Sequence, residues 1–266
     1  MSEELISIAK RLAEAGGKAA LTYFRGQGLT ADNKSSADFD PVTEGDRAAE
    51  QAMRAILAAE RPQDGILGEE FGQSQGESGW VWVLDPIDGT RGFLAGTPVW
   101  GVLVGLRNAQ GPQFGIIEQP FIGERFFGGL GEAGYTGPRG NADLKTRSTT
   151  KLSDAILFST FPEVGSAAEA EAFHKVSRQA KLTRYGCDCY AYGLLALGQI
   201  DLVIEAGLHA YDIVAPIAVV EAAGGVITNW SGESAAEGGR VVAAATPELH
   251  QAALELLSQC HDEEFA

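Results

Sequence analysis

The sequence predicts an α+β first half followed by an α/β second half. Two helical segments open the chain, a series of short apolar runs separated by Gly, Pro and Asn follows, and strands then alternate with helices to the end. The stretch 135–153 is polar and lacks clear periodicity. We therefore expect a boundary there, with halves spanning 1–145 and 146–266.

The first half begins with helical spacing at 3–25 and 43–60. Thr43, Glu44 and Asp46 suit the start of the second helix, because acids complement the positive end of a helix dipole. The apolar runs that follow are typical of an antiparallel sheet, with strands expected at 65–70, 81–86, 100–106, 114–120 and 124–129.

The second half alternates regularly. Strands are expected at 155–160, 181–186, 201–206, 225–230 and 241–246, and helices at 169–180, 189–199, 212–224 and 247–259. Such alternation is typical of α/β architecture.

Composition indicates a globular protein that works in water. Hydrophobic residues make up 45% of the 266 residues, and no unbroken apolar run is long enough to span a membrane. The first helix begins with acids and lacks the layout of a secretory signal, so we expect a cytoplasmic protein. Three cysteines without a C-x-x-C pair argue against a disulfide framework or a zinc site.

The charge of the chain constrains its partners. A net charge of −16 repels nucleic-acid phosphates and anionic membrane surfaces, so we expect neither as a partner. An acidic protein still binds a small phosphorylated metabolite when metal ions reverse the field inside the site.

Carboxylates gather where predicted strands end or a helix begins. Glu69 and Glu70 end one strand, Asp85 and Asp88 end the next, and Asp212 opens a helix. Strand ends and helix starts commonly face a shared cleft, where several acids would repel one another unless cations lie among them. Hard oxygen ligands of this kind suit Mg²⁺ or Mn²⁺ better than zinc.

The segment WVLDPIDGTRGF, residues 82–93, carries the most specific pattern. Pro86 bends the chain, which lets Asp85, the Ile87 carbonyl and Asp88 turn toward one side. Gly89 and Thr90 would then begin a helix whose free N–H groups bind phosphate. A D-P-x-D-G run is also a common turn, and paired glutamates are often a solvated rim, so each motif alone has a structural interpretation.

Four segments together resemble the inositol monophosphatase family of Mg²⁺-dependent phosphatases: KSSADFDPVTEGD, GEE, WVLDPIDGTRGF and AYDIVAPIAVVEAAGG. The resemblance extends from about residue 5 to residue 258. It implies a layered αβαβα sandwich of the inositol monophosphatase and fructose-1,6-bisphosphatase type, which agrees with the α+β and α/β halves. It also implies a homodimer.

The resemblance assigns roles to individual residues. It implies that two or three Mg²⁺ ions are held by Glu69, Asp85, the Ile87 carbonyl, Asp88 and Asp212, with Asp46 joining the third ion. Gly89 and Thr90 would hold the phosphate, Thr90 and Glu70 would position the attacking water, and Lys34 would approach the site. The mechanism implied is hydrolysis of a phosphomonoester by a metal-activated water.

The substrate is less tightly specified. The segments RGFLAGTPVWG, RYGCDCYAYG and IEAGLHAYD resemble the histidinol-phosphatase subgroup, which serves histidine biosynthesis. The resemblance places Asp188 and Glu205 at substrate-contact positions, where they would pair with the cationic groups of histidinol phosphate. Glu205 also occurs in the inositol enzymes, so Asp188 discriminates better between the two substrates. Asp188 has an alternative role as a helix N-cap, and Arg184 would approach either the cleft or a second subunit.

Two other functions stay open at this point. One is an inositol-1-phosphatase or a phosphatase with broad tolerance for sugar and polyol esters. The other is a regulatory protein that binds other proteins through the same fold, although every metal-ligand position that we can map holds an oxygen donor.

Overall fold

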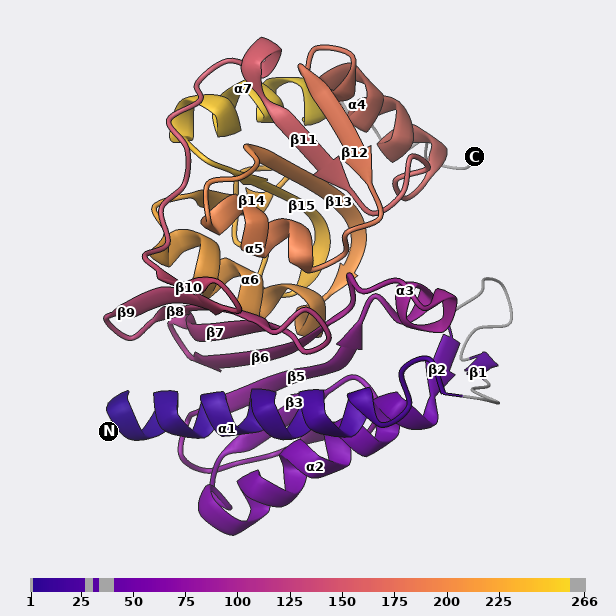
Figure 1. Cartoon of the computed structure of the whole chain (residues 1–266). Helices are drawn as coiled ribbons and strands as arrows, with labels where there is room; N and C mark the ends of the chain where they lie inside the picture. Colours follow the sequence, from indigo (N-terminus) through magenta and orange to yellow (C-terminus); the bar gives the residue numbers. More distant parts are fainter. Residues whose placement is uncertain (1, 27–30, 34–40, 259–266) are drawn as a thin grey trace, which may run out of the picture.

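Layers of helix, sheet, helix, sheet and helix follow one another in the computed structural model, which describes residues 2–26, 31–33 and 41–258 (Figure 1). The predicted αβαβα sandwich is therefore confirmed. The proposed division near residue 145 stays a prediction.

The first layer contains α1 (Ser2–Leu21) and α2 (Glu44–Glu60), which pack on each other and on one face of the first sheet. Leu12, Met53 and Trp82 are fully buried between them. Thr43 begins α2 as its N-cap, as its position in the sequence suggests. The helix α1 ends four residues earlier than expected, in a turn over 22–25.

The first sheet has eight strands in the order β10-β9-β8-β7-β6-β5-β3-β4. The strands are β3 (Gly65–Gly68), β4 (Gly72–Ser74), β5 (Val81–Asp88), β6 (Gly101–Asn108), β7 (Gly111–Gln119), β8 (Glu124–Gly129), β9 (Glu132–Gly137) and β10 (Gly140–Ala142). Only β3 and β5 pair in parallel. A separate pair, β1 (Ala31–Asn33) and β2 (Pro41–Thr43), lies before α2.

The middle layer contains α5 (Tyr190–Ala196) and α6 (Ala210–Ala222). The helix α6 is apolar nearly all round and contacts strands of both sheets, so its burial on two sides explains its composition. Figure 1 shows both helices between the two sheets.

The second sheet has five strands in the order β12-β11-β13-β15-β14. They are β11 (Ile156–Ser159), β12 (Leu182–Tyr185), β13 (Leu202–His209), β14 (Val226–Asn229) and β15 (Gly238–Ala244). The helices α4 (Ala167–Ser177) and α7 (Pro247–Leu257) form the last layer, and the short helices α3 (Thr90–Ala95) and η1 (Leu152–Asp154) lie in connections.

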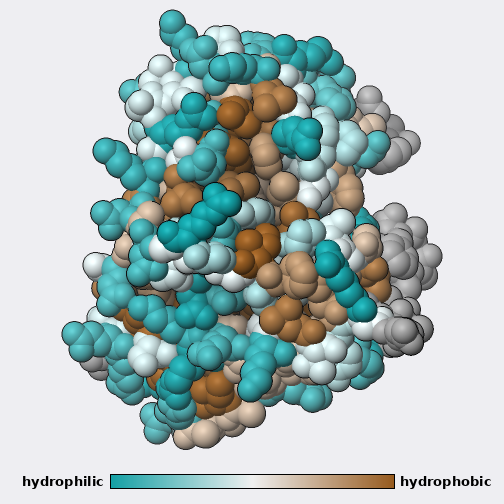
Figure 2. Space-filling view, viewed as in Figure 1, coloured by the Kyte–Doolittle hydropathy of each residue, from teal (hydrophilic) through white to brown (hydrophobic). Residues whose placement is uncertain are grey.

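The viewed surface is mixed in polarity. Figure 2 shows hydrophilic side chains over most of this face, with hydrophobic ones set between them. Within the described ranges, every helix is too short or too polar to span a lipid bilayer.

Candidate active site

The turn from β5 into α3 brings two acids to one side of the first sheet. A β-bulge against β6 lies between Asp85 and Asp88, and it accommodates Pro86, which has no N–H for the ladder. Asp85 Oδ1 accepts a hydrogen bond from the Ile87 N–H at 3.0 Å, which fixes the turn. Gly89 follows with φ of 85°, a left-handed conformation that favours glycine.

The first acid cluster joins this turn to the start of α6. Asp85, Asp88 and Asp212 each place a carboxylate oxygen within 4.8 Å of the others. Asp212 lies in the first turn of α6, far along the chain from the other two. Asp212 Oδ2 accepts a hydrogen bond from the His209 N–H at 2.7 Å, so the helix start holds this side chain in place. The structure thus brings together three of the predicted ligands.

The second acid cluster comprises Asp46, Glu69 and Glu70, whose carboxylate oxygens lie within 4.8 Å of one another. Asp46 is fully buried at the start of α2, and its Oδ2 accepts hydrogen bonds from the N–H of Thr43 at 2.8 Å and from its hydroxyl at 2.5 Å. Its Oδ1 lies 3.5 Å from the Thr90 hydroxyl. Asp46 therefore links the start of α2 to the turn after β5.

A buried glutamate that we did not predict supports this second cluster. Glu50 accepts hydrogen bonds from the Glu70 N–H at 2.7 Å and from Arg54 Nε at 2.7 Å, although it is fully buried. A Cβ atom on Gly68 would lie 2.0 Å from Glu50 Oε1, so glycine leaves the room that this contact needs. No motif marks Glu50, because it stands in the middle of an amphipathic helix.

Replacing Glu50 with glutamine should lower the free energy of unfolding by roughly 2–4 kcal/mol, because Arg54 would lose its buried counter-ion. If these acids form a catalytic site, kcat should fall by roughly tenfold or more, because the Glu69–Glu70 turn would lose its anchor. Urea unfolding and steady-state kinetics measure both. Glu44→Gln, at an exposed position of the same helix, is the control, and equal losses in the two variants would remove the supporting role of Glu50.

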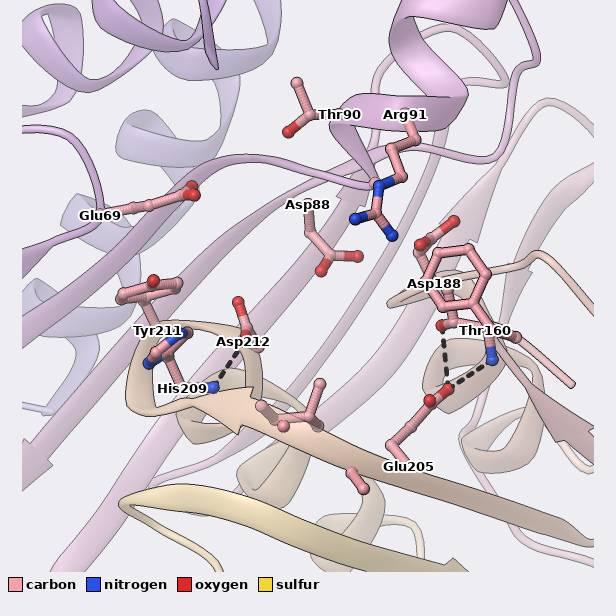
Figure 3. Close-up of a pocket in the computed structure, with 15 residues that line it drawn as sticks. Glu69, Asp88, Thr90, Arg91, Thr160, Asp188, Glu205, His209, Tyr211 and Asp212 are labelled. Carbon is pink, nitrogen blue, oxygen red and sulfur yellow. Dashed lines mark hydrogen bonds between the residues drawn. The ribbon is translucent and has the colours of Figure 1, made fainter. Parts of the chain in front are cut away.

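A cavity of about 350 Å³ lies beside the acid clusters (Figure 3). Asp88, Asp212 and Glu69 line one part of it, and Thr90 and Arg91 border it from α3. Thr160, Phe161, Asp188, Ala206, Gly207, Leu208, Tyr211 and Glu205 are also in its lining. In Figure 3 the Arg91 guanidinium extends into the space between the Asp88 and Asp188 side chains.

Asp188 lies directly against Gly89, the residue that precedes α3. Its φ of 45° is left-handed, and a Cβ atom on Gly89 would come within 3.1 Å of its carboxyl carbon. The next residue, Cys189, donates its N–H to Asp88 Oδ2 at 2.6 Å. The alternative role of Asp188 as helix N-cap is wrong, because α5 begins one residue later, after Cys189.

Glu205 closes the opposite wall of the cavity. It is 6% exposed, and its Oε1 accepts hydrogen bonds from the Thr160 N–H at 2.8 Å and from the Thr160 hydroxyl at 2.9 Å. Thr160 follows β11, a strand parallel to its neighbour β13. Thr160 and Phe161 were not predicted, although their position after a parallel strand is where ligands commonly bind.

The carboxylates of the cavity share a field that disfavours negative charge. Burial, and then the charge of Asp212, raise the pKa of Asp88 to about 7. Burial and Asp88 raise the pKa of Asp188 to about 7 against the opposing effect of Arg91, and burial raises that of Glu205 to about 8. Burial and then Glu69 raise the pKa of Asp85 well above its ordinary value. Cations would reverse this field.

Three further residues lie differently. Lys34 is outside the described residues. Arg184 is exposed on β12, and it does not line the cavity that the described residues form. His209 is exposed at the cavity edge, where its ring stacks on Tyr211 at 5.0 Å between centroids.

The donor chemistry of the two clusters fits hard divalent cations. Each cluster in the described part consists of carboxylates alone, without histidine or cysteine, which is the donor set of Mg²⁺ or Mn²⁺ sites. A phosphoryl group brought to the adjoining turn would meet the α3 start and the positive charge of such ions. The fold and the site therefore define a metal-dependent phosphomonoesterase.

Comparison with known proteins gives the family. The profile of the inositol monophosphatase family matches residues 1–262, and the chain belongs to this family. The bifunctional phosphatase IMPL2 of Arabidopsis thaliana is 40% identical over 266 residues, which cover 96% of this chain and 75% of the relative. The histidinol-phosphatase of Mycobacterium tuberculosis is 33% identical, with 91% of this chain and 94% of the relative covered.

A solved structure agrees with these relatives. The inositol monophosphatase of Zymomonas mobilis superposes with a TM-score of 0.85 at 40% identity, with 96% of this chain and 98% of that chain covered. Histidinol-phosphatases and inositol monophosphatases are thus both similar to nearly the whole of this chain. The similarity therefore shows the class of reaction, hydrolysis of a phosphomonoester, more closely than it shows which ester is hydrolysed.

Proposed function

We propose that the protein is a Mg²⁺-dependent L-histidinol-phosphate phosphatase of histidine biosynthesis. The observation that carries this proposal is the pair Asp188 and Glu205 in the cavity lining. Histidinol phosphate has a primary ammonium and an imidazole, whereas inositol offers only hydroxyls, so these carboxylates favour the cationic ester. The relatives that are named histidinol-phosphatases support the same substrate.

Two or three Mg²⁺ ions, with Mn²⁺ as a substitute, would be held by Glu69, Asp85, the Ile87 carbonyl, Asp88, Asp212 and Asp46. The two clusters of carboxylate oxygens support this assignment. When bound, the ions supply Lewis acidity that lowers the pKa of water and charge that stabilises the phosphoryl oxygens and the leaving alkoxide.

The protein's own groups would orient the reactants. The Thr90 hydroxyl lies 3.0 Å from the Ile87 carbonyl oxygen and 3.5 Å from Asp46, so its proton has acceptors and its oxygen can accept a hydrogen bond from water. Glu70 would hold the same water, and the N–H groups of Gly89 and Thr90 would hold the phosphate. As the water oxygen bonds to phosphorus, the bond to the alcohol oxygen breaks, releasing histidinol and inorganic phosphate.

Steady-state kcat/KM on L-histidinol phosphate and on inositol 1-phosphate, with Mg²⁺, tests the substrate. We expect the histidinol ester to be preferred, and a preference for the inositol ester would overturn the proposal. Asp188→Ala should lower kcat/KM by roughly tenfold more on the histidinol ester than on a small phosphate ester of a neutral alcohol. Only the histidinol ester has a cationic group that pairs with Asp188.

A homodimer is also part of the proposal. The edge strand β12 supports it, because Leu182 and Tyr185 on this strand are 47% and 39% exposed and Arg184 lies between them. Sedimentation velocity should give about twice the mass of 28.0 kDa for one chain, whereas a monomer would contradict it.

A further inference from the structure

A small chamber adjoins the active-site cavity. Its volume is about 20 Å³, which is room for one group the size of a water molecule. Asp88, Thr160, Asp188, Glu205, Leu208 and Asp212 line both the cavity and the chamber. A ligand in the cavity can therefore extend one small group into the chamber.

Tyr192 of α5 lines the chamber but not the larger cavity. Its side chain is 3% exposed, and its buried hydroxyl has no hydrogen-bond partner among the described residues. Buried tyrosine hydroxyls nearly always have a partner. A group or a water molecule bound in the chamber would give the Tyr192 hydroxyl the partner that it lacks.

The lining specifies the chemistry of that group. With divalent ions on Asp88 and Asp212, the carboxylates left to an occupant of the chamber are those of Asp188 and Glu205, which offer only acceptors when ionised. A group with hydrogen-bond donors and positive charge would complement these two carboxylates and keep them ionised. A primary ammonium has three N–H donors, no acceptor and a suitable size, whereas an alcohol hydroxyl brings one donor and no charge.

We propose that the chamber binds a primary ammonium group of the substrate, with the Tyr192 hydroxyl as acceptor and Asp188 and Glu205 as counter-ions. Asp88 and Asp212 would face the divalent ions. Asp88 lines the chamber and directly precedes Gly89 and Thr90, which line the larger cavity, so an ammonium in the chamber would lie close to a phosphoryl group at Gly89 and Thr90. The substrate class proposed is therefore phosphate esters of 2-amino alcohols, an inference that rests on the proposed phosphatase function.

A matched pair of esters tests the chamber without the imidazole. 2-Amino-3-hydroxypropyl phosphate and glycerol 3-phosphate differ only by an ammonium or a hydroxyl on the central carbon. With the full-length protein and Mg²⁺, kcat/KM should be at least roughly tenfold higher for the amino ester, mainly through a lower KM.

Tyr192→Phe removes the hydroxyl with little change of shape. It should lower the ratio of the two kcat/KM values, amino ester over hydroxy ester, by roughly tenfold. Tyr190→Phe is the matched control from the same helix, because the Tyr190 hydroxyl donates to Glu124 at 2.7 Å, outside the chamber. The ratio should not change in this control.

The outcomes separate the chamber from the substrate assignment. A wild-type ratio near one, or a ratio that Tyr192→Phe leaves unchanged, would overturn the proposal that the chamber binds an ammonium group. That conclusion would hold even if the enzyme prefers histidinol phosphate. An enzyme that prefers inositol 1-phosphate but keeps a Tyr192-dependent ratio supports the chamber and overturns the histidinol assignment.

Discussion

Replacing Asp88 with asparagine should lower kcat by roughly a thousandfold or more while leaving the fold intact. Asp88 belongs to the first cluster, lines the cavity and accepts a hydrogen bond from the Cys189 N–H. An asparagine oxygen still accepts that hydrogen bond, but it no longer supplies a negative charge to a divalent ion. Steady-state kinetics over a range of Mg²⁺ concentrations measures the loss.

The same substitution should stabilise the metal-free protein. Removing one charge from a partly buried cluster of like charges should raise the free energy of unfolding at pH 8 by roughly 2–4 kcal/mol. Asp143→Asn, at an exposed position, is the control for loss of one carboxylate. Full activity of Asp88→Asn at ordinary Mg²⁺ concentration would remove Asp88 from the ligand set.

The metal-free protein should become less stable as the pH rises from about 5 to about 8. In the folded chain the pKa of Asp88 and Asp188 is about 7 and that of Glu205 about 8. Because these carboxyls titrate near pH 4 when unfolded, the folded chain binds more protons than the unfolded chain across this range. The contribution of these carboxyls to the free energy of unfolding is fully present below about pH 4 and is lost as the pH rises through 7 to 8. Tm in EDTA should fall by roughly 5–15 °C between pH 5.5 and 8.5.

Mg²⁺ should reverse this loss. Its stabilising effect should be large at pH 8 and small at pH 5.5, where protonated carboxyls no longer bind the ion. His250 acts in the opposite direction, since burial lowers its pKa and its contribution is lost as the pH falls. Thermal unfolding with and without Mg²⁺ measures the balance. A Tm in EDTA that rises steadily with pH would show that the acids do not dominate.

The sequence predicts that Asp85 and Asp88 lie together, because both stand in one short segment. Asp85, Pro86, Asp88 and Gly89 are consecutive or nearly so, and their backbone preferences determine the bulge and the helix start. The sandwich follows from the order of helical and strand patterns. By contrast, β4, β9 and β10 lie toward the edges of their sheet, where exposure removes the alternation on which strand prediction depends.

The residues that sequence reasoning missed depend on tertiary contact. Glu50 supports Glu70 across 20 positions of sequence, and Thr160 supports Glu205 across 45. Tyr192 has the composition of an ordinary core position, and only its lack of a partner distinguishes it. The N-cap role considered for Asp188 failed because the left-handed backbone at this residue places the helix start one residue later.

The hydrogen bond from the Cys189 N–H to Asp88 joins positions that are 101 residues apart in the sequence. Asp188 is adjacent to that bond and packs on Gly89, so the loop that we propose to select the ester also contacts a proposed metal ligand. We expect substitutions at 187–189 that change ester preference to change Mg²⁺ affinity as well. Divergence of substrate in this lineage would then favour changes at Thr160, Phe161 or Tyr192, which leave that bond untouched.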